Sequence, residues 1–356
     1  MSYLEINLEK IKHNAEYLKN QLEHKEISII GITKLVLGNP SIARILTKAG
    51  LNYLGDSRIG NIVRMKKAGV KAKFVLIRNP ALSEIPLIIK NCDISLNTEL
   101  FTIKKLSIEA LKQNKIHSII IMVEMGDLRE GVMPHDLDKL VEAVLKLENI
   151  KLVGIGTNLK CFAGVIPDAE KMRNFSGLAN LIQNKYDIEF KFISAGNSAN
   201  YDWAISASNL GIINNLRLGT AILLGKGGIE EAPIPNLHQD AFTFVAEIVE
   251  LKEKPYFPNG IVTTNAFGEP SIFKLVKKPK KNYLIKHALL NSGRQDVEEK
   301  GLEPIDDVKI LGASSDYLVI DLKNYNFKIG DRLKFLIDYE AILKAMTCPF
   351  VSKVFI

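Results

Sequence analysis

Residues 27–40 read ISIIGITKLVLGNP, a short and almost wholly apolar run that ends in a single lysine, Lys34. Segments with helical periodicity precede and follow this run. Apolar runs of this length between helices are typical of a strand buried on both faces of a parallel sheet. A lysine at the carboxyl end of such a strand either reaches water as an ordinary surface cation or is held in the mouth of the sheet as a reactive amine.

The alternation of an apolar run with a helical segment repeats along roughly the first 225 residues. The predicted strands span residues 27–34, 52–56, 73–78, 93–96, 117–125, 151–158, 190–195 and 212–218. Eight strand–helix units in succession predict a closed (β/α)8 TIM barrel. The alternative, an open doubly wound sheet, requires a GxGxxG fingerprint after its first strand, and this sequence has none there.

From about residue 240 onward, short alternating runs separated by turn residues replace the helical pattern. The predicted strands of this part span residues 242–251, 272–276, 307–311, 317–322 and 332–337. They indicate a second, smaller and mostly β domain. The glycine- and proline-rich segment 225–236 predicts a barrel over residues 1–230 and a β domain over 231–356. The alternative for the first few residues is that they pack on the C-terminal domain.

The composition is that of a globular protein, with 47% hydrophobic and 24% charged residues. We find no apolar run long enough to span a bilayer and no signal pattern at the N-terminus. Three widely spaced cysteines without a CxxC pair argue against a disulfide framework or a metal site and fit a reducing cytoplasm. The net charge of +7 is spread along the chain, and its densest cluster, KKPKK at 277–281, is predicted to form a hairpin turn. We therefore expect an anionic small-molecule ligand rather than nucleic acid.

Functional sites of such barrels lie at the carboxyl ends of the strands, and phosphate groups bind at the loops after strands seven and eight. The first strand ends at Lys34 and the eighth at Arg217, and closure of the barrel makes these strands neighbours. Ser198, Gly219 and Thr220 follow strands seven and eight, where backbone N–H and hydroxyl groups can approach a phosphate. An amine, a phosphate nest and an arginine in one mouth are what pyridoxal 5'-phosphate requires.

Several motifs resemble one known family. They are YLEINLEKIKHN at 3–14, GDLREG at 126–131, RLGTAI at 217–222 and GASSDYLVID at 312–321. In their order and spacing they are similar to the alanine racemase family, a barrel class of pyridoxal-phosphate enzymes with a C-terminal β domain. The resemblance gives Lys34 the role of the Schiff-base lysine and places Asn197 and Ser198 at the cofactor phosphate. It implies that Arg129 contacts the cofactor's phenolic oxygen and the substrate carboxylate.

Four departures separate the chain from standard alanine racemases, and one is Phe355, where the family has a closing tyrosine. Gly38 lies near the position of a family tyrosine, and Asn158 replaces an imidazole under the cofactor ring. Arg294, in GRQD at 293–296, stands where the family has the catalytic tyrosine that the partner subunit contributes. The segments NLKC at 158–161 and GRQDV at 293–297 are more similar to the ornithine racemase branch, which implies a larger or basic amino acid as substrate.

The resemblance implies an isomerase that inverts the α-carbon of a free amino acid, most simply as a head-to-tail homodimer with shared active sites. Arg294 and Asp296 are candidates for binding substrate, and Asp296, Asp316 and Cys161 are alternatives for the second catalytic base. An alternative for Asp296 is that it caps a turn. Four other functions stay open: a racemase of alanine or of broad specificity, a lyase or decarboxylase with the same cofactor, a non-catalytic carrier of that cofactor, and a barrel aldolase without it.

Overall fold

The computed structural model describes residues 1–275 and 283–356 and divides into two compact units. One unit runs from Leu8 to Gln239, so it continues past residue 230, where the composition placed the domain boundary. The other unit combines Met1–Asn7 with Asp240–Ile356. The N-terminal strand therefore belongs to the same unit as the C-terminal sheet. The turn predicted at residues 277–281 lies outside the described residues.

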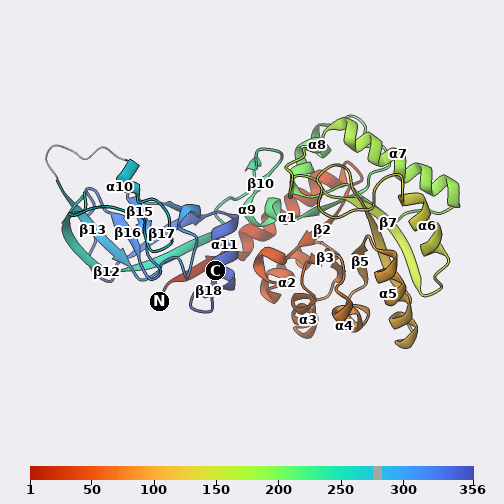
Figure 1. Cartoon of the computed structure of the whole chain (residues 1–356), viewed down its shortest axis with the longest axis horizontal. Helices are drawn as coiled ribbons and strands as arrows, with labels where there is room; N and C mark the ends of the chain where they lie inside the picture. Colours follow the sequence, from red (N-terminus) through yellow and green to blue (C-terminus); the bar gives the residue numbers. More distant parts are fainter. Residues whose placement is uncertain (276–282) are drawn as a thin grey trace. The chain divides into compact units, whose positions relative to one another are not determined.

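Eight parallel strands close into a barrel in the first unit, which confirms the predicted fold (Figure 1). They are β2 (Ser28–Ile32), β3 (Tyr53–Asp56), β4 (Lys73–Leu76), β5 (Ile94–Asn97), β6 (His117–Val123), β7 (Ile150–Thr157), β8 (Phe192–Ser194) and β9 (Asn215–Leu218). Strand β2 pairs with β3 on one side and with β9 on the other, where Gly31 lies opposite Leu218. This last pairing closes the ring and makes the first and eighth barrel strands neighbours.

The barrel interior is filled by side chains from alternate strand positions. One cluster of buried residues contains Ile30, Ile32, Val75, Ile94, Leu96, Ile120, Met122, Val153 and Phe192. The intervening residue Gly31 faces the helices, because a Cβ there would meet Leu51 and Leu54 at 2.9 and 3.3 Å. Full burial of each branched side chain contributes about 1.5–3 kcal/mol. The apolar strands therefore form a packed core rather than a pore.

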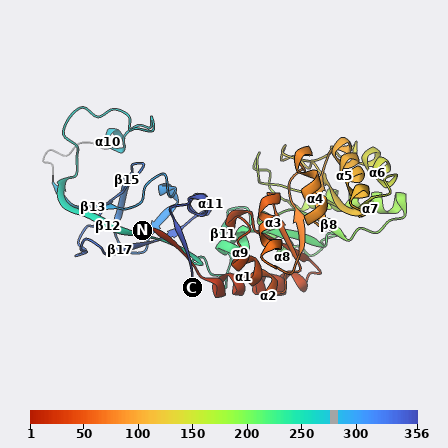
Figure 2. The same cartoon turned by 90° about the horizontal axis from the view of Figure 1, so that it is seen from below.

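Helices cover the outside of the barrel, and Figure 2 shows α4, α5 and α6 side by side. The helices of this unit are α1 (Leu8–Glu23), α2 (Pro40–Lys48), α3 (Ile59–Lys67), α4 (Ile85–Asn91), α5 (Leu100–Lys112), α6 (Leu137–Leu145), α7 (Ala169–Tyr186), α8 (Tyr201–Ser206) and α9 (Thr220–Leu224). Helix α1 buries Ile11, Ala15, Leu18 and Leu22, which recur at helical spacing on one face. No helix within the described ranges is both long and apolar enough to cross a membrane.

The second unit is built around an antiparallel sheet in the order β14, β17, β12, β13, β16, β15. Its strands are β12 (Phe242–Pro255), β13 (Leu284–Leu290), β14 (Leu302–Pro304), β15 (Lys309–Ala313), β16 (Leu318–Asp321), β17 (Arg332–Ile337) and β18 (Ser352–Phe355). Strand β1 (Tyr3–Ile6) pairs antiparallel with β12 and parallel with β18. The prediction of a smaller, mostly β domain is thus confirmed.

The strand predicted at residues 272–276 is wrong for its described part, because Ile272–Leu275 form the short helix α10. The Ser271 hydroxyl accepts a hydrogen bond from the Phe273 backbone N–H (3.3 Å), which favours a turn over an extended chain. The ring of Phe273 packs edge-on against Tyr256 and Phe257, with centroids 5.9 and 5.6 Å apart. The sequence analysis also did not predict β13 or the helix α11 (Tyr339–Thr347).

Candidate active site

Three strand ends bring most of the predicted site residues to one rim of the barrel. Lys34 follows β2, Ser198 follows β8, and Gly219 and Thr220 follow β9. Because β9 pairs with both β2 and β8, these residues follow three adjacent strands of the barrel. Arg217 lies within β9 itself, the strand next to β2, which Lys34 follows. The topology therefore gathers an amine, a guanidinium and two hydroxyl groups at the rim where such barrels hold their sites.

Lys34 begins a short 3-10 turn (Lys34–Val36), and its side chain is partly buried. Its amine makes no hydrogen bond or ion pair with any described residue. The preceding residue is held firmly, since the Thr33 hydroxyl donates to Asp56 Oδ2 (2.8 Å). Asp56 is fully buried and also accepts from the Asn61 amide (2.9 Å). Burial raises the pKa of Asp56, while these hydrogen bonds act to lower it. The backbone beneath Lys34 is thus fixed while the amine stays available.

The connection after Lys34 explains one departure from the alanine racemase pattern. Leu37 and Gly38 both have positive φ values, +54° and +59°. A Cβ at Gly38 would lie 2.8 Å from the Cβ and 2.9 Å from the carbonyl oxygen of Asn61. Asn39 then caps α2, accepting from the Ser41 N–H at 3.0 Å, with Pro40 as the first helical residue. The chain turns back too tightly at residue 38 for a tyrosine.

Arg217 is 5% exposed, and both of its terminal nitrogens are held by the protein. Nη1 donates to the Ser194 hydroxyl (2.7 Å), and Nη2 donates to the Thr157 carbonyl (2.7 Å). Its Nε–H has no acceptor in the part of the chain that the structure describes. Burial lowers the pKa of Arg217 to about 10, so the guanidinium remains charged at neutral pH. Arg217 is therefore a rigid cation with one N–H left to donate.

Asn158 lies between two arginines. Its side-chain amide is 3.3 Å from Arg217 Nη2, and its other end is 3.2 Å from Arg129 Nη2. Since both guanidinium groups only donate, the amide oxygen of Asn158 can accept from one of them at a time. The adjacent Thr157 hydroxyl is buried and has no hydrogen-bond partner among residues 1–275 and 283–356. This part of the rim is consequently rich in donors and short of acceptors.

Arg129 is held in place by the loop after β6. Its guanidinium forms an ion pair with the neighbouring Glu130. Burial acts to lower the pKa of Arg129, but the hydrogen bonds and charge of Glu130 outweigh it, so this pKa is raised. Glu124 accepts hydrogen bonds from the backbone N–H groups of Gly126 (2.5 Å), Leu128 (3.0 Å) and Arg129 (3.2 Å). A carboxylate at the end of β6 thus organises the whole turn that presents the arginine.

Asp127, also in this loop, connects it to the loop after β7. Its carboxylate accepts from the N–H groups of Cys161 and Phe162, each at 2.9 Å, and of Val165 at 3.3 Å. The Asn197 amide donates to Leu159 O (2.9 Å) and to the Cys161 sulfur (3.2 Å). Residues from β6, β7 and β8 are therefore tied into one polar surface around the rim.

The segment after β8 contains Asn197 and Ser198, which we predicted to lie at a phosphate. Asn197 caps the 3-10 turn Ser198–Asn200, accepting from the Ala199 N–H (2.8 Å). The Ser198 oxygen accepts from the N–H groups of Gly219 (3.4 Å) and Ala221 (3.1 Å) at the start of α9. The hydroxyl protons of Ser198 and Thr220 have no acceptor within the described residues. Two hydroxyl donors are thus available where the loops after β8 and β9 meet.

The three candidates from the C-terminal sequence belong to the other unit. Arg294 pairs with Glu269 (2.6 Å) and with the buried Glu299 (2.5 Å), and its guanidinium lies 4.2 Å from the centre of the Phe267 ring. Asp296 is buried and accepts from the Gly293 N–H (3.0 Å), as the turn-capping alternative expected. Asp316 is exposed and accepts from the Gln295 amide (3.1 Å). Each of these side chains has contacts of its own within this unit, and the proposed roles of all three stay predictions.

Sequence reasoning did not single out Asp56, Glu124 or Asp127. Each acts mainly through backbone N–H groups or a neighbouring hydroxyl, and these contacts cannot be read from residue type alone. A detectable signal did exist, since all three acids follow apolar runs at the carboxyl ends of barrel strands. No group of three or more histidine, cysteine, aspartate or glutamate side chains within residues 1–275 and 283–356 is placed to hold a metal ion.

Known proteins resemble this chain over nearly its whole length. The family model described as alanine racemase, N-terminal domain, matches residues 6–226. The chain is 36% identical to the ornithine racemase of Acetoanaerobium sticklandii, over 98% of each chain. It is also 36% identical to the lysine racemase of Thermotoga maritima, over 98% of this chain and 97% of that one. The alanine racemase of Clostridium difficile 630 in complex with cycloserine has the same fold, with a TM-score of 0.77 at 19% identity over 100% of this chain and 95% of the other. The chain therefore belongs to the alanine racemase family, which confirms the predicted resemblance.

Proposed function

We propose that this protein is a pyridoxal-phosphate-dependent racemase of a basic amino acid such as ornithine or lysine. The observation that carries the proposal is the amine of Lys34, which has no hydrogen-bond partner among the described residues. Lys34 follows β2, the strand next to β9, which carries the buried cation Arg217. The two relatives at 36% identity, an ornithine racemase and a lysine racemase, support the substrate class. Membership of the alanine racemase family supports the reaction class.

The residues at the rim fit pyridoxal phosphate in charge and hydrogen-bonding character. The amine of Lys34 would hold its aldehyde carbon, and the hydroxyls of Ser198 and Thr220 with the backbone at Gly219 would hold its phosphate. The free Nε–H of Arg217 would face the ring nitrogen, and Arg129 and Asn158 would face the ring's phenolic side. When bound, the cofactor withdraws electrons from the α-carbon of the substrate and so makes its C–H bond acidic.

Lys34 is the proposed base on one face of the α-carbon. Its side chain is partly buried and its amine has no partner in the described part of the chain, so we expect it to accept the α-proton and return it. Arg217 has a different role, because a guanidinium donates and does not give up its proton at neutral pH. Arg217 would therefore leave a ring nitrogen that faces it without a proton and so limit how strongly the cofactor withdraws electrons. We expect Arg217 in this way to limit side reactions such as transamination.

The opposite face of the α-carbon needs a second proton carrier. Of the three candidates, Asp296 already accepts hydrogen bonds from Ser292, Gly293 and Cys348, which leaves it poorly suited to the task. Cys161 belongs to the same unit as Lys34, and the Asn197 amide donates to its sulfur (3.2 Å), which holds the sulfur in place at this rim. Cys161 and Asp316 therefore remain the proposed alternatives. If the partner subunit supplies Asp316 or Arg294, the enzyme is a homodimer with shared sites.

The three cysteines are unpaired, which supports a reducing cytoplasm as the location of the protein.

A chiral assay tests the proposal. The purified protein, supplied with pyridoxal phosphate, is incubated with single enantiomers of ornithine, lysine, alanine and serine. We expect the opposite enantiomer to accumulate from ornithine or lysine and the activity to disappear in Lys34→Ala. Turnover of alanine alone would contradict the substrate class. A bound chromophore without inversion of any substrate would contradict the racemase and leave a lyase, a decarboxylase or a carrier of the cofactor.

The same assay in heavy water separates the two candidates for the second base. A racemase with two bases exchanges the α-proton of each enantiomer through a different group. Loss of the second base should stop inversion while deuterium still enters one enantiomer through Lys34. We therefore compare Cys161→Ala with Asp316→Asn, and the variant that shows this one-sided exchange identifies the base.

A further inference from the structure

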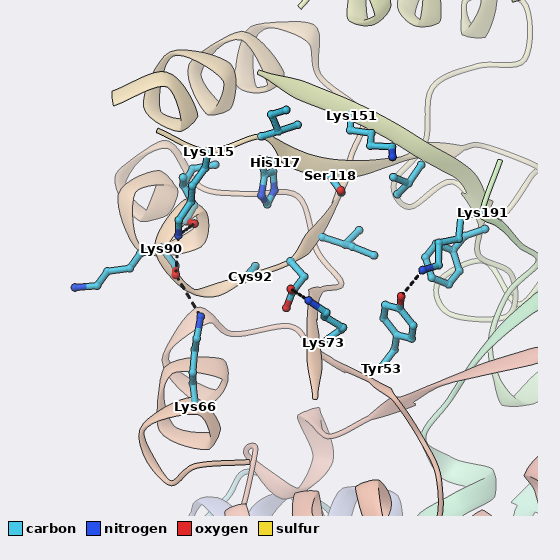
Figure 3. A pocket seen from close by; sticks show the side chains of 16 residues that line it. Tyr53, Lys66, Lys73, Lys90, Cys92, Lys115, His117, Ser118, Lys151 and Lys191 are labelled. Carbon is cyan, nitrogen blue, oxygen red and sulfur yellow. Dashed lines mark hydrogen bonds and ion pairs between the residues drawn. The ribbon is translucent and has the colours of Figure 1, made fainter. Parts of the chain in front are cut away.

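A hollow lies at the rim of the barrel where the strands begin, opposite the rim that carries Lys34 (Figure 3). Its volume is about 410 Å3, and first residues of several barrel strands line it, including Tyr53 of β3, Lys73 of β4 and His117 of β6. Lys34 and Arg217 lie toward the other ends of the strands. We call this hollow the basal lysine cavity, after the six lysines that contribute to its walls: Lys66, Lys73, Lys90, Lys115, Lys151 and Lys191.

The charge of the basal lysine cavity is strongly one-sided. Asp93 supplies the single carboxylate among the described residues that line it. The Lys90 side chain points away, so five lysine ammonium groups against one aspartate leave an excess of four positive charges at neutral pH. His117 adds none, because burial lowers the pKa of its imidazole to about 4. A hollow lined by one sign of charge attracts counter-ions of the other sign.

Two of the ammonium groups are crowded together. Lys66 Nζ donates to the carbonyl oxygens of Lys90 (3.3 Å) and Asn91 (3.2 Å). Lys115 Nζ donates to Ile89 O (2.8 Å) and to the same Lys90 oxygen (3.2 Å), so the two cations meet at the end of α4. Figure 3 shows them reaching toward each other from opposite sides, while the Lys90 side chain points away. The negative end of the helix dipole accounts for this pair but not for the remaining lysines.

The other side of the cavity carries three more cations. Lys73 pairs with Asp93 at 3.0 Å, and Lys151 is exposed without a partner among the described residues. Lys191 donates to the Tyr53 hydroxyl (2.6 Å), and its amine lies 5.2 and 5.6 Å from the centres of the Tyr53 and Phe192 rings. Because an ammonium group covers both rings, they offer poor surfaces for stacking a base. Recognition in this cavity must therefore depend on charge.

We propose that the basal lysine cavity binds a small polyanion with two or more linked phosphate groups, such as inorganic tripolyphosphate. A single phosphate carries at most about two charges near neutral pH and would leave about half of the excess unbalanced. A chain of phosphates could contact both the Lys66–Lys115 side and the Lys73–Lys151–Lys191 side. The cavity is also separate from the predicted cofactor site, so its ligand need not compete with the cofactor.

Calorimetric titration of tripolyphosphate into the full-length protein tests the proposal. The protein is first saturated with pyridoxal phosphate, so that the nest at Ser198 and Thr220 is filled, and the buffer contains 150 mM salt to screen non-specific attraction. Lys151→Glu reverses an exposed charge of the cavity. Lys139→Glu makes the same change in net charge on the exposed face of α6, outside the cavity, and is the matched control.

We expect saturable binding whose Kd rises about tenfold or more in Lys151→Glu and less than about twofold in Lys139→Glu. Lys191→Gln, which removes a cation from the same side, should also raise the Kd. Equal weakening by Lys151→Glu and Lys139→Glu, or no saturable binding, would overturn the proposal. So would binding that disappears when the cofactor is added, since that ligand would occupy the nest. Tighter binding of a short single-stranded DNA would assign the lysines to nucleic acid instead.

Discussion

At Arg217, one buried guanidinium holds two parts of the rim in place. It donates to Ser194 at the end of β8 and to the Thr157 carbonyl at the end of β7. A lysine there has one ammonium group and cannot replace both contacts, so Arg217→Lys leaves a buried acceptor without a donor. We expect the free energy of unfolding to fall by about 1–3 kcal/mol and kcat to fall with it. Urea unfolding measures the first effect, and the chiral assay measures the second.

The control for this variant is Arg173→Lys, which makes the same exchange at an exposed position of α7. Its effect on the free energy of unfolding should stay within about 0.5 kcal/mol. If the two variants lose the same stability, the buried hydrogen bonds of Arg217 contribute nothing special.

His117 predicts a pH dependence of stability. Burial lowers the pKa of its imidazole from 6.5 to about 4, and Nε2 lies 2.9 Å from the Ser95 hydroxyl. As the pH falls below 6.5, the imidazole of His117 binds a proton in the unfolded chain but stays neutral in the folded barrel. The stability present above pH 6.5 is therefore lost progressively toward pH 4. Between pH 7 and pH 5 we expect the native protein to lose about 2 kcal/mol more than His117→Gln. Urea unfolding at both pH values, with equal losses in the two proteins, would contradict this assignment.

Residues of the candidate site differ in how far sequence could predict them. The alternation of strands and helices indicates which residues lie at the ends of barrel strands, and it therefore predicted Lys34, Arg217 and Ser198. The structure places these three residues at adjacent strands. Asp127 could not be found in this way, because it stabilises the loop after β7 through backbone N–H groups more than thirty residues further along the chain. Such a contact depends on the folded path of two loops, and residue type alone does not indicate it.

At the scale of elements, the turn between β2 and α2 decides where Lys34 lies. Gly38 combines a positive φ of +59° with close approach to Asn61, so a methyl group there is both strained and crowded. We expect Gly38→Ala to lower the free energy of unfolding by about 1–3 kcal/mol and to reduce racemase activity, because the Lys34 turn must shift.

Gly177 provides the matched control for this turn. It lies exposed in α7, with no atom within 4 Å of an added Cβ. Gly177→Ala should raise stability by about 0.5–1 kcal/mol, since alanine favours a helix. Thermal unfolding of both variants would show opposite shifts, and a shared direction would argue against strain at Gly38.

The elements of the barrel were easier to predict than those of the sheet. Barrel strands such as β6 are apolar on both faces, and most of β6 is buried, so their sequences are conspicuous. Strand β13 reads LIKHALL and carries Lys286 and His287 in its middle, because its surface is only partly covered. The helix α10 was mistaken for a strand, since four apolar or basic residues carry no clear period. Partial burial is thus what concealed the elements of the second unit.

At the scale of the whole molecule, the two ends of the chain are joined in one sheet. Strand β1 pairs with β12 and β18, and its residues Leu4 and Ile6 are fully buried. The chain then leaves this unit at Asn7 and enters the barrel unit through α1. The C-terminal sheet therefore requires the N-terminal strand for its completion, although the whole barrel separates them in sequence.

This arrangement predicts that a change at the N-terminus weakens the C-terminal sheet. Leu4→Ala removes a fully buried side chain that faces Phe244 in the register of β1 and β12, at a cost of about 2–5 kcal/mol. The exposed Leu87→Ala in α4 is the control and should change stability by less than about 0.5 kcal/mol. Hydrogen exchange should show faster exchange in β12 and β18 of Leu4→Ala, with β2 and β9 unchanged, if the units open independently. Equal acceleration in β2 and β9 would instead mean that sheet and barrel unfold as one cooperative body, and the loss of a single N-terminal leucine would then also disturb the Lys34 site.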